Sequence, residues 1–463
     1  MRGEKCGVFG IYSPGQDVAR LTCYGLSALQ HRGQESSGIV VTDGEQFRAH
    51  IKPGLVAQVF NDEILDGLEG FAAIGHNRYS TSGSKDTHLQ PVLRNDDVLS
   101  LAHNGNLPSV TALKKFLSSK KVLKHDSNDS ELMTDVIRYF CYQGLSTSEA
   151  IQKSWPFFTG AFSCLLLDQD KLYAFRDQNG VRPLSIAKLN GGYVVASETC
   201  AFDTIGAEFV RDVRPGELLE ISGKGLKSIQ VRKGRENLEV FEYIYFARPD
   251  SMLQGQSINE VRRRLGATLG IESPVEADIV IPIPDSAIPA ALGYSHQTGI
   301  EFDFGLIKNR YIHRTFITPD QKSREKDVHL KLNALSSLLS GKRIVIVDDS
   351  IVRATTMSKI IQLVREAGAS EVHVRISSPP VLYPDFYGID TPDQTQLIAF
   401  RLKEMKKIKR YIGATSLAYL SFDGMIDAIG VKRSQLCLAC FDGKYPVDLL
   451  ERKKEVQQAK FQD

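Results

Sequence analysis

Two neighbouring aspartates and a following pair of threonines give the clearest chemical pattern in the sequence. Asp348 and Asp349 end the apolar run IVIVDD, and after a short turn Thr355 and Thr356 begin a stretch with helical periodicity. Ligands of open α/β sheets bind at the carboxyl ends of the strands. A helix N-terminus suits a phosphate group, and paired carboxylates suit ribose hydroxyls or a hard cation such as Mg²⁺. The pattern therefore indicates a sugar-phosphate site, and the plainer alternative is an acidic turn before a capped helix.

A second reactive group stands near the start of the chain. Cys6 lies in the apolar string CGVFGI, where a lone cysteine is ordinarily a small buried hydrophobic residue. If residues 1–5 are removed as a propeptide, Cys6 becomes the first residue. Its α-amino group, with a reference pKa of about 8, is then able to take the proton of its own thiol. One residue would supply both the nucleophile and the general base.

The sequence around Cys6 has the pattern of an antiparallel β domain. Short apolar runs such as SSGIVVTD and GAFSCLLLDQDKLYAFRD alternate with glycine-rich turns. Such runs are typical of half-buried strands with tight connections, so we expect an antiparallel α+β or sandwich arrangement. Around residues 221–238 the composition shifts to Gly, Lys and Arg, and we place a domain boundary there.

The sequence around the aspartate pair follows a different pattern. Continuous β-branched runs occur at 278–284, 341–349 and 371–379. Residues 355–370, between the last two runs, carry apolar side chains at helical spacing. Apolar strands that alternate with helices are typical of a parallel sheet buried on both faces. The second half is therefore predicted to be an α/β domain.

Composition narrows the class of protein. The chain has 463 residues, 42% of them hydrophobic, which suits two or three globular domains and excludes a disordered chain. A formal charge of +2 argues against a nucleic-acid-binding role. No apolar run reaches the ~20 residues of a membrane span. Seven cysteines, mostly single in apolar runs, and a polar N-terminus without a secretory signal indicate a cytoplasmic protein.

The aspartate and threonine pairs also resemble a known motif. The string VDDSIVRATT is similar to the phosphoribosyl diphosphate loop of type I phosphoribosyltransferases, above all that of the glutamine phosphoribosylpyrophosphate amidotransferases. The strings FEYIYFARPDS, PIPDS, GLIKNRYIHRTFI and FDGKYP resemble the same family, so the likeness covers nearly the whole chain. It implies an α/β type I phosphoribosyltransferase domain with a mainly parallel sheet over residues 239–463.

This resemblance implies a role for each residue of the second site. Asp348 and Asp349 would hold the ribose and Mg²⁺, with Ser286 beside the metal. The other residues that it implies in phosphoribosyl diphosphate binding, from the phosphate loop and a mobile loop, are Ser350, Arg353, Ala354, Thr355, Thr356, Arg314, Arg324 and Lys331. Cationic side chains in a closing loop would stabilise the departing diphosphate and exclude water.

Three positions depart from the family pattern: Ala354, His313 and Ala287, the last of which follows the PDS string. Ala354 stands where the family usually has Gly in the phosphate loop, and His313 stands at a usual Gly of the mobile loop. Ala costs about 1 kcal/mol if the backbone φ is positive there, and little otherwise. The departures leave the aspartates and threonines intact, but they put the strength of the phosphoribosyl site in question.

Four strings of the first half resemble the N-terminal-nucleophile glutamine amidotransferases: HRGQESSGI, GHNRYSTSG, AHNGNL and SNDSE. The resemblance implies an α+β domain over residues 6–238, with layered antiparallel sheets between helices. In such a domain the side chain of Asn104 and the N–H of Gly105 would form the oxyanion hole for the attack by Cys6. A Gly-Asn turn and a helix capping box are structural roles that the last two strings would fill alongside the functional ones.

The same resemblance assigns the binding of glutamine. Arg78 would clasp the α-carboxylate, Asp129 would pair with the α-ammonium group, and Arg32 would support the site from behind.

Taken together, the two halves predict glutamine-dependent synthesis of 5-phosphoribosylamine, the entry step of purine synthesis, with ammonia channelled between the sites. The family implies feedback by purine nucleotides and a homo-oligomer, either a tetramer or a dimer. One alternative is a sugar-isomerising amidotransferase. Another is a glutaminase-competent paralogue or a phosphoribosyltransferase-like regulator whose phosphoribosyl site is impaired.

The cysteine pair near the C-terminus bears on cofactors. Many members of the family hold a four-iron, four-sulfur cluster on four cysteines, two of them in a pair like Cys437 and Cys440. The other two positions are Glu239 and Asp385 here, and carboxylates are poor substitutes for thiolates on a cluster. We therefore predict no iron–sulfur cluster and Mg²⁺ as the required metal. A zinc site of two thiolates and two carboxylates is the alternative.

Overall fold

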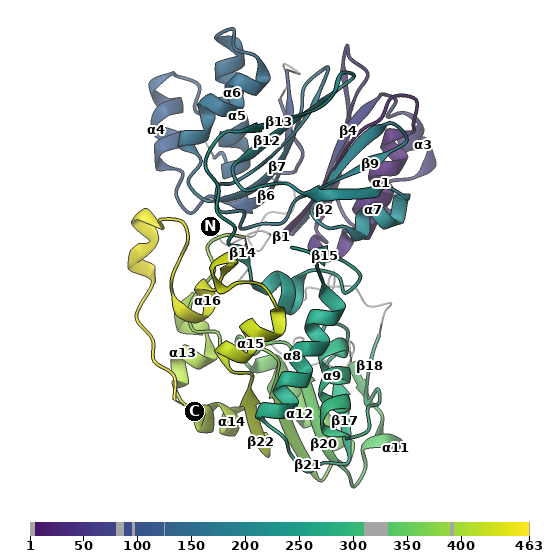
Figure 1. The fold of residues 1–463 in the computed structure, drawn as a ribbon, viewed down its shortest axis with the longest axis vertical. Coiled ribbons are helices and arrows are strands. Elements are labelled where there is room, and N and C mark those ends of the chain that lie inside the picture. The colour runs from purple at the N-terminus through teal and green to yellow at the C-terminus, as the bar shows by residue number, and fades with distance from the viewer. Residues whose placement is uncertain are drawn as a thin grey trace.

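The first half of the chain folds as two antiparallel sheets packed face to face (Figure 1). The computed structural model describes residues 5–79, 88–94, 98–124, 126–309, 332–388 and 393–462. Along the first sheet the strand order is β11 (Glu208–Asp212), β9 (Ser185–Leu189), β10 (Gly192–Ala196), β1 (Lys5–Tyr12), β4 (Ala72–Tyr79), β2 (Ser36–Thr42) and β3 (Phe47–Pro53). Along the second it is β13 (Gly225–Gln230), β12 (Glu217–Ser222), β8 (Leu172–Arg176), β7 (Ala161–Leu167), β6 (Ser100–Asn106) and β5 (Val92–Leu93).

Helices cover the outer face of each sheet, which gives four layers. The first sheet is covered by α1 (Val18–Ala28) and α7 (Cys200–Ile205), and the second by α4 (Thr111–Ser119), α5 (Asp129–Tyr142) and α6 (Thr147–Ser154). A third apolar cluster, with Val8, Ile74 and Leu165, fills the space between the sheets. The predicted α+β domain with antiparallel sheets between helices is confirmed.

The prediction of half-buried strands is wrong for the central strands. Every residue of β2 and of β7 is buried. The reason is the layering: a central strand has helices on one face and the other sheet on the opposite face, so neither face meets water. Strand β3, at the edge of the first sheet, is less covered, and each of its residues is partly or largely exposed to solvent.

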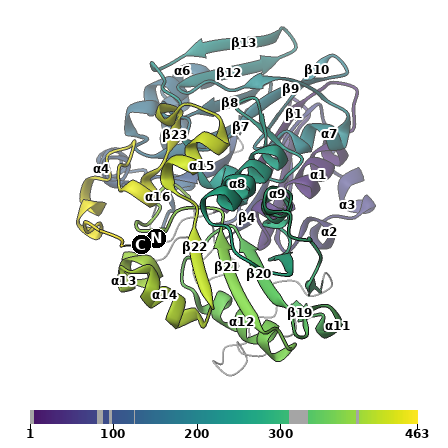
Figure 2. The same cartoon turned by 60° about the horizontal axis from the view of Figure 1, so that its bottom comes forward.

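The second half contains the predicted parallel sheet. Its order is β17 (Ile279–Pro282), β20 (Arg343–Asp348), β21 (Glu371–Ile376) and β22 (Ser416–Tyr419), all parallel. Helices α8 (Ile258–Glu272), α9 (Ile288–Thr298) and α15 (Phe422–Ile429) pack on one face, and α12 (Thr355–Glu366) and α14 (Met405–Ile412) on the other. Figure 2 shows this sheet and its helices from below.

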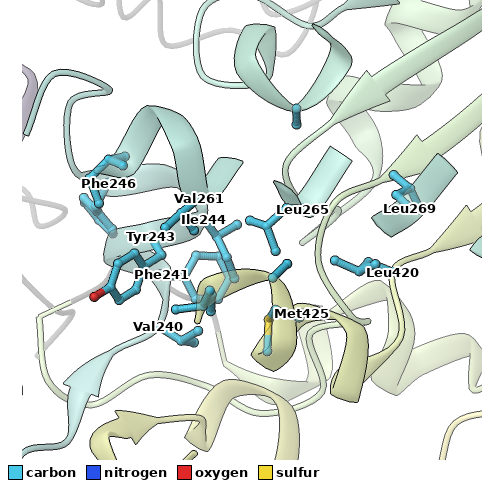
Figure 3. Close-up of a cluster of buried hydrophobic side chains, with 14 of the residues drawn as sticks. Val240, Phe241, Tyr243, Ile244, Phe246, Val261, Leu265, Leu269, Leu420 and Met425 are labelled. Carbon is cyan, nitrogen blue, oxygen red and sulfur yellow. The ribbon is translucent and has the colours of Figure 1, made fainter. Parts of the chain in front are cut away.

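The IVIV run of β20 shows how the sheet is buried on both faces. Val345 and Val347 belong to the apolar cluster with α8 and α9, whereas Ile344 and Ile346 belong to the cluster with α12 and α14. Alternate side chains of a strand point to opposite faces, so an unbroken apolar run serves two cores. The first of these cores also takes in Phe241, Tyr243 and Ile244, which lie beside α8 (Figure 3).

Short strands connect distant parts of the chain. β14 (Leu238–Glu239) pairs in parallel with β23 (Leu436–Cys437), and β18 (Leu306–Lys308) pairs with β19 (Leu332–Ala334). Among the described helices, none is both long enough and apolar enough to cross a membrane.

Candidate active sites

Cys6 lies in β1, in the middle of the first sheet. It stands opposite Arg78 of the neighbouring strand β4, and both residues are buried. The carbonyl oxygen of Cys6 accepts a 3.0 Å hydrogen bond from Nε of Arg32. Residues 1–4 of the predicted propeptide lie outside the described part of the chain.

Asn104 and Gly105 lie in β6, on the second sheet. The side-chain amide of Asn104 is fully buried and donates to Ser197 Oγ over 3.3 Å. The same hydroxyl accepts a 3.0 Å hydrogen bond from the N–H of Val8 in β1. Ser197 therefore ties the strand of Cys6 to the strand of Asn104. Gly105 has a φ of +153°, and a Cβ at this position would collide with the carbonyl oxygen of Ala161, so the strand requires glycine here.

Asp129 stands in the first turn of α5, next to the end of β6. Its Oδ2 accepts a 3.1 Å hydrogen bond from the N–H of Leu107, and His103 Nδ1 lies 3.8 Å from the same oxygen. The capping box predicted for this helix is present, formed by Asn128 and Glu131. The carboxylate is thus held at the end of β6 by a backbone hydrogen bond.

Arg32 is more deeply buried than a substrate-binding arginine would be, with 1% of its surface exposed. In addition to the carbonyl oxygen of Cys6, Arg32 binds the carboxylates of Glu198 and Glu242. Burial alone would lower the pKa of Arg32, but these two carboxylates raise it above its ordinary value. Arg32 therefore supports the backbone of Cys6.

The aspartate pair lies at the carboxyl end of the parallel sheet. Asp348 ends β20, and Asp349 follows it, with its N–H donating to Asp348 Oδ1 over 2.9 Å. Asp349 also accepts hydrogen bonds from the hydroxyls of Ser286, at 2.6 Å, and Ser350, at 2.8 Å. Burial and the adjacent charge of Asp349 hold the pKa of Asp348 well above its ordinary value. These groups offer only oxygen ligands, which is the donor set that Mg²⁺ prefers.

The phosphate loop ends at Ala354, which is the N-cap of α12. Its φ is +65°, in the left-handed region, so the condition for strain at this departure from the family is met. No side chain caps the helix, and Thr355 and Thr356 are exposed in its first turn. A helix N-terminus without a side-chain cap suits the predicted phosphate group. Arg314, Arg324, Lys331 and His313 lie outside the described residues.

The four residues that align with the cluster ligands of the family lie near one another in the fold. Glu239 is the partner of Cys437 in the β14–β23 pair, and Asp385 and Cys440 are also buried. Burial and the neighbouring Asp385 raise the pKa of Glu239 to about 8. Within the described ranges, no three His, Cys, Asp or Glu side chains converge as a metal site. Two thiols and two carboxyls do not fit an iron–sulfur cluster.

Several residues that hold these sites were missed at the sequence level. Ser197 and Glu198 lie in the string VVASETC, and Arg182 and Glu242 also lie within mostly apolar strings. Their position inside apolar strings could have indicated that these charged residues are buried and paired, because charged residues are rarely buried without a partner.

The fold and the two sites define a class: a glutamine amidotransferase joined to a phosphoribosyltransferase. Residues 76–204 match the glutamine amidotransferase domain family, and residues 257–378 match the phosphoribosyl transferase domain family.

Known proteins that are similar to both halves of the chain identify the family more closely. The amidophosphoribosyltransferase of Synechococcus elongatus is 47% identical over 459 residues, covering 97% of this chain and 93% of the relative. That of Bacillus subtilis is 45% identical over 457 residues, covering 97% and 95%. The solved structure of the Bacillus subtilis glutamine phosphoribosylpyrophosphate amidotransferase, complexed with ADP and GMP, has a TM-score of 0.89 and covers 96% of this chain and 98% of its own.

The chain belongs to the amidophosphoribosyltransferase family. It is an enzyme that forms 5-phosphoribosylamine from glutamine and phosphoribosyl diphosphate, the first step of purine biosynthesis. The sugar-isomerising and regulatory alternatives are thereby set aside, and the predicted family is confirmed.

Proposed function

We propose that residues 6–238 hydrolyse glutamine through Cys6 after removal of residues 1–5. The thiol attacks the side-chain amide carbon, and the α-amino group of Cys6 takes the thiol proton. Asn104 and the N–H of Gly105 stabilise the oxyanion of the tetrahedral intermediate. Collapse of the intermediate returns the proton to the leaving ammonia and leaves a thioester, which water hydrolyses to glutamate. The single observation that supports this most strongly is Ser197, which bonds both to the Cys6 strand and to Asn104.

Arg78 and Asp129 are assigned to the two charged ends of glutamine. Arg78 lies across from Cys6 on the adjacent strand, which suits the α-carboxylate. Asp129 is anchored beside the end of β6, which suits the α-ammonium group.

Residues 239–463 carry out the phosphoribosyl transfer. Asp348, Asp349 and Ser286 would bind Mg²⁺ and the ribose, and the segment from Ser350 to Thr356 would bind the 5-phosphate. Mg²⁺, when bound there, would neutralise charge on the diphosphate. Arg314, Arg324 and Lys331 are assigned to a loop that closes over the diphosphate, by family resemblance. Ammonia would pass directly from the first site to the second.

The protein is proposed to work without an iron–sulfur cluster, because Glu239 and Asp385 supply hard ligands at two of the four positions. Purine nucleotides are its proposed feedback inhibitors, since the Bacillus subtilis relative was solved with ADP and GMP. The resemblance further supports a cytoplasmic homo-oligomer. Metal analysis tests the cofactor proposal: stoichiometric iron with acid-labile sulfide would contradict it, and stoichiometric zinc would favour the mixed-ligand alternative.

The experiment that tests the coupled reaction is a glutaminase assay on purified protein with and without phosphoribosyl diphosphate. Glutamate release should rise when the diphosphate is added. N-terminal mass spectrometry of the same sample should find Cys6 as the first residue. Glutamate release that ignores the diphosphate, or full activity with an intact Met1, would contradict the proposal.

A further inference from the structure

A buried group of four charged residues joins the nucleophile to the second half of the chain. Arg32, which donates to the carbonyl oxygen of Cys6, binds Glu242 in bidentate fashion, with Nη2–Oε1 at 2.7 Å and Nη1–Oε2 at 3.0 Å. Its Nη1 also donates to Glu198. Arg182 lies 3.0 Å from Glu242 Oε1 and completes the group. All four side chains are at most 1% exposed.

The charges of this group balance, which lowers the free-energy cost of burying them. Two guanidinium groups face two carboxylates, and the ring of Phe246 lies 6.0 Å from the guanidinium carbon of Arg32 and 5.5 Å from that of Arg182. Removing one member of a buried ion pair is strongly destabilising, because it leaves the other charge uncompensated. The position of the Arg32 guanidinium therefore depends on Glu242.

Glu242 belongs to the second half of the chain, whereas Arg32, Arg182 and Glu198 belong to the first. It begins the π-helical turn Glu242–Phe246, which packs beside Val261 and Leu265 of α8 (Figure 3). Arg262 of α8 holds the turn at both ends, by donating to the carbonyl oxygens of Tyr243 and Ala247 over 2.8 Å each.

The same α8 arginine is in the electrostatic field of the phosphoribosyl site. Burial lowers the pKa of Arg262 to about 10, and the negative charge of Asp349 opposes that shift. Hydrogen bonds and ion pairs thus run from Arg262 to the carbonyl oxygens of the turn, and from Glu242 through Arg32 to the carbonyl oxygen of Cys6.

We propose that Glu242 is a positioning residue for the glutaminase reaction: it holds Arg32, and through Arg32 the backbone of Cys6, so that the first site is complete only when the second half is docked. The inference rests on the proposed role of Cys6 as nucleophile. This role explains why a carboxylate from the second half of the chain binds the arginine that contacts the backbone of Cys6. A glutaminase that depends on that half does not release ammonia where no acceptor site exists.

The test is Glu242→Gln in the full chain, which keeps the shape of the side chain and removes its charge. We expect kcat for glutamine hydrolysis to fall about tenfold or more, because a small misplacement of reacting groups lowers the rate of the chemical step. KM for glutamine should change little. Synthesis from added ammonium salt and phosphoribosyl diphosphate should stay within about twofold of the wild-type rate. If this variant does not fold, Glu242→Asp carries the same test, because it keeps the charge but is one methylene too short for the bidentate contact.

The matched control is Glu217→Gln. Glu217 is also fully buried and paired with an arginine, Arg211 at 2.8 Å, but its partners on β11, on β13 and at the N–H of Arg214 do not contact Cys6. This control should lower thermal stability without a selective loss of glutamine hydrolysis. Wild-type glutamine kcat in Glu242→Gln, or an equal loss of both activities, would overturn the inference. A Cys6→Ala variant that still hydrolyses glutamine would instead overturn the proposed function on which it rests.

Discussion

The hydroxyl of Ser286 donates a 2.6 Å hydrogen bond to Oδ2 of Asp349, so the turn after β17 is tied to the end of the adjacent strand β20. The two strands are parallel neighbours, and their carboxyl ends therefore lie at the same edge of the sheet. Asp349 also accepts from the hydroxyl of Ser350. One carboxylate is thus oriented by hydroxyls from two different strand ends, and the carboxyl group of Asp348 lies next to it at the same edge of the sheet.

Replacing Ser286 with Ala should weaken the phosphoribosyl site alone. Loss of one hydrogen bond to a charged group corresponds to about 1.5–3 kcal/mol, so KM for phosphoribosyl diphosphate should rise about ten- to 150-fold. The measurement is ammonia-dependent synthesis at varied phosphoribosyl diphosphate and Mg²⁺. An unchanged KM for the diphosphate would show that Asp349 does not need this orientation.

Cys6→Ala should separate the two activities. Use of glutamine should be lost, because no nucleophile remains, while synthesis from ammonium salt should persist because the aspartate pair is untouched. Cys23→Ala is the matched control, since Cys23 is buried in α1 and should be dispensable for both activities. Asp348→Asn combined with Asp349→Asn should abolish both routes. Loss of the ammonia route in a folded Cys6→Ala protein would mean that the two sites are not separable.

Features of the fold and of the sites could be predicted from the sequence when the residues that form them lie close together along the chain. The strand, acidic turn and helix at Asp348 could be predicted because their signals are local: an apolar run, a turn and helical spacing within 341–370. The contact of Arg32 with Glu242 could not, because 210 residues separate the two and no spacing rule connects them. The central strands β2 and β7 were predicted as half-buried because a strand's pattern does not reveal a second covering layer.

The positive φ of Ala354 predicts a gain on substitution with glycine. An L-residue in the left-handed region carries a strain of about 1 kcal/mol, which Ala354→Gly removes, and a loop free of that strain holds its ligand-binding conformation more of the time. KM for phosphoribosyl diphosphate should fall by up to about fivefold. Ala367→Gly is the control at the other end of α12: its φ is −74°, so glycine brings no relief and should only reduce stability. Unchanged or weaker binding in Ala354→Gly would show that the loop has adapted to alanine.

His76 predicts a loss of stability in mild acid. It lies in β4, fully buried, and burial lowers its pKa to about 3, despite a 3.1 Å contact between its Nε2 and the carbonyl oxygen of His103. The folded protein therefore keeps His76 neutral where the unfolded chain, with an ordinary pKa of 6.5, takes up a proton.

Because the unfolded state binds more protons, the free energy of unfolding falls as the pH drops from 6.5 towards 3. The slope approaches about 1.4 kcal/mol per pH unit for this group. His76→Gln removes the titration, so its stability should fall less between pH 7 and pH 5 than that of the wild type, by about 2 kcal/mol. Urea unfolding at both pH values measures the difference, which is independent of any loss that the substitution causes at pH 7. Equal pH dependence in the two proteins would show that His76 takes up a proton in the fold at the same pH as in the unfolded chain.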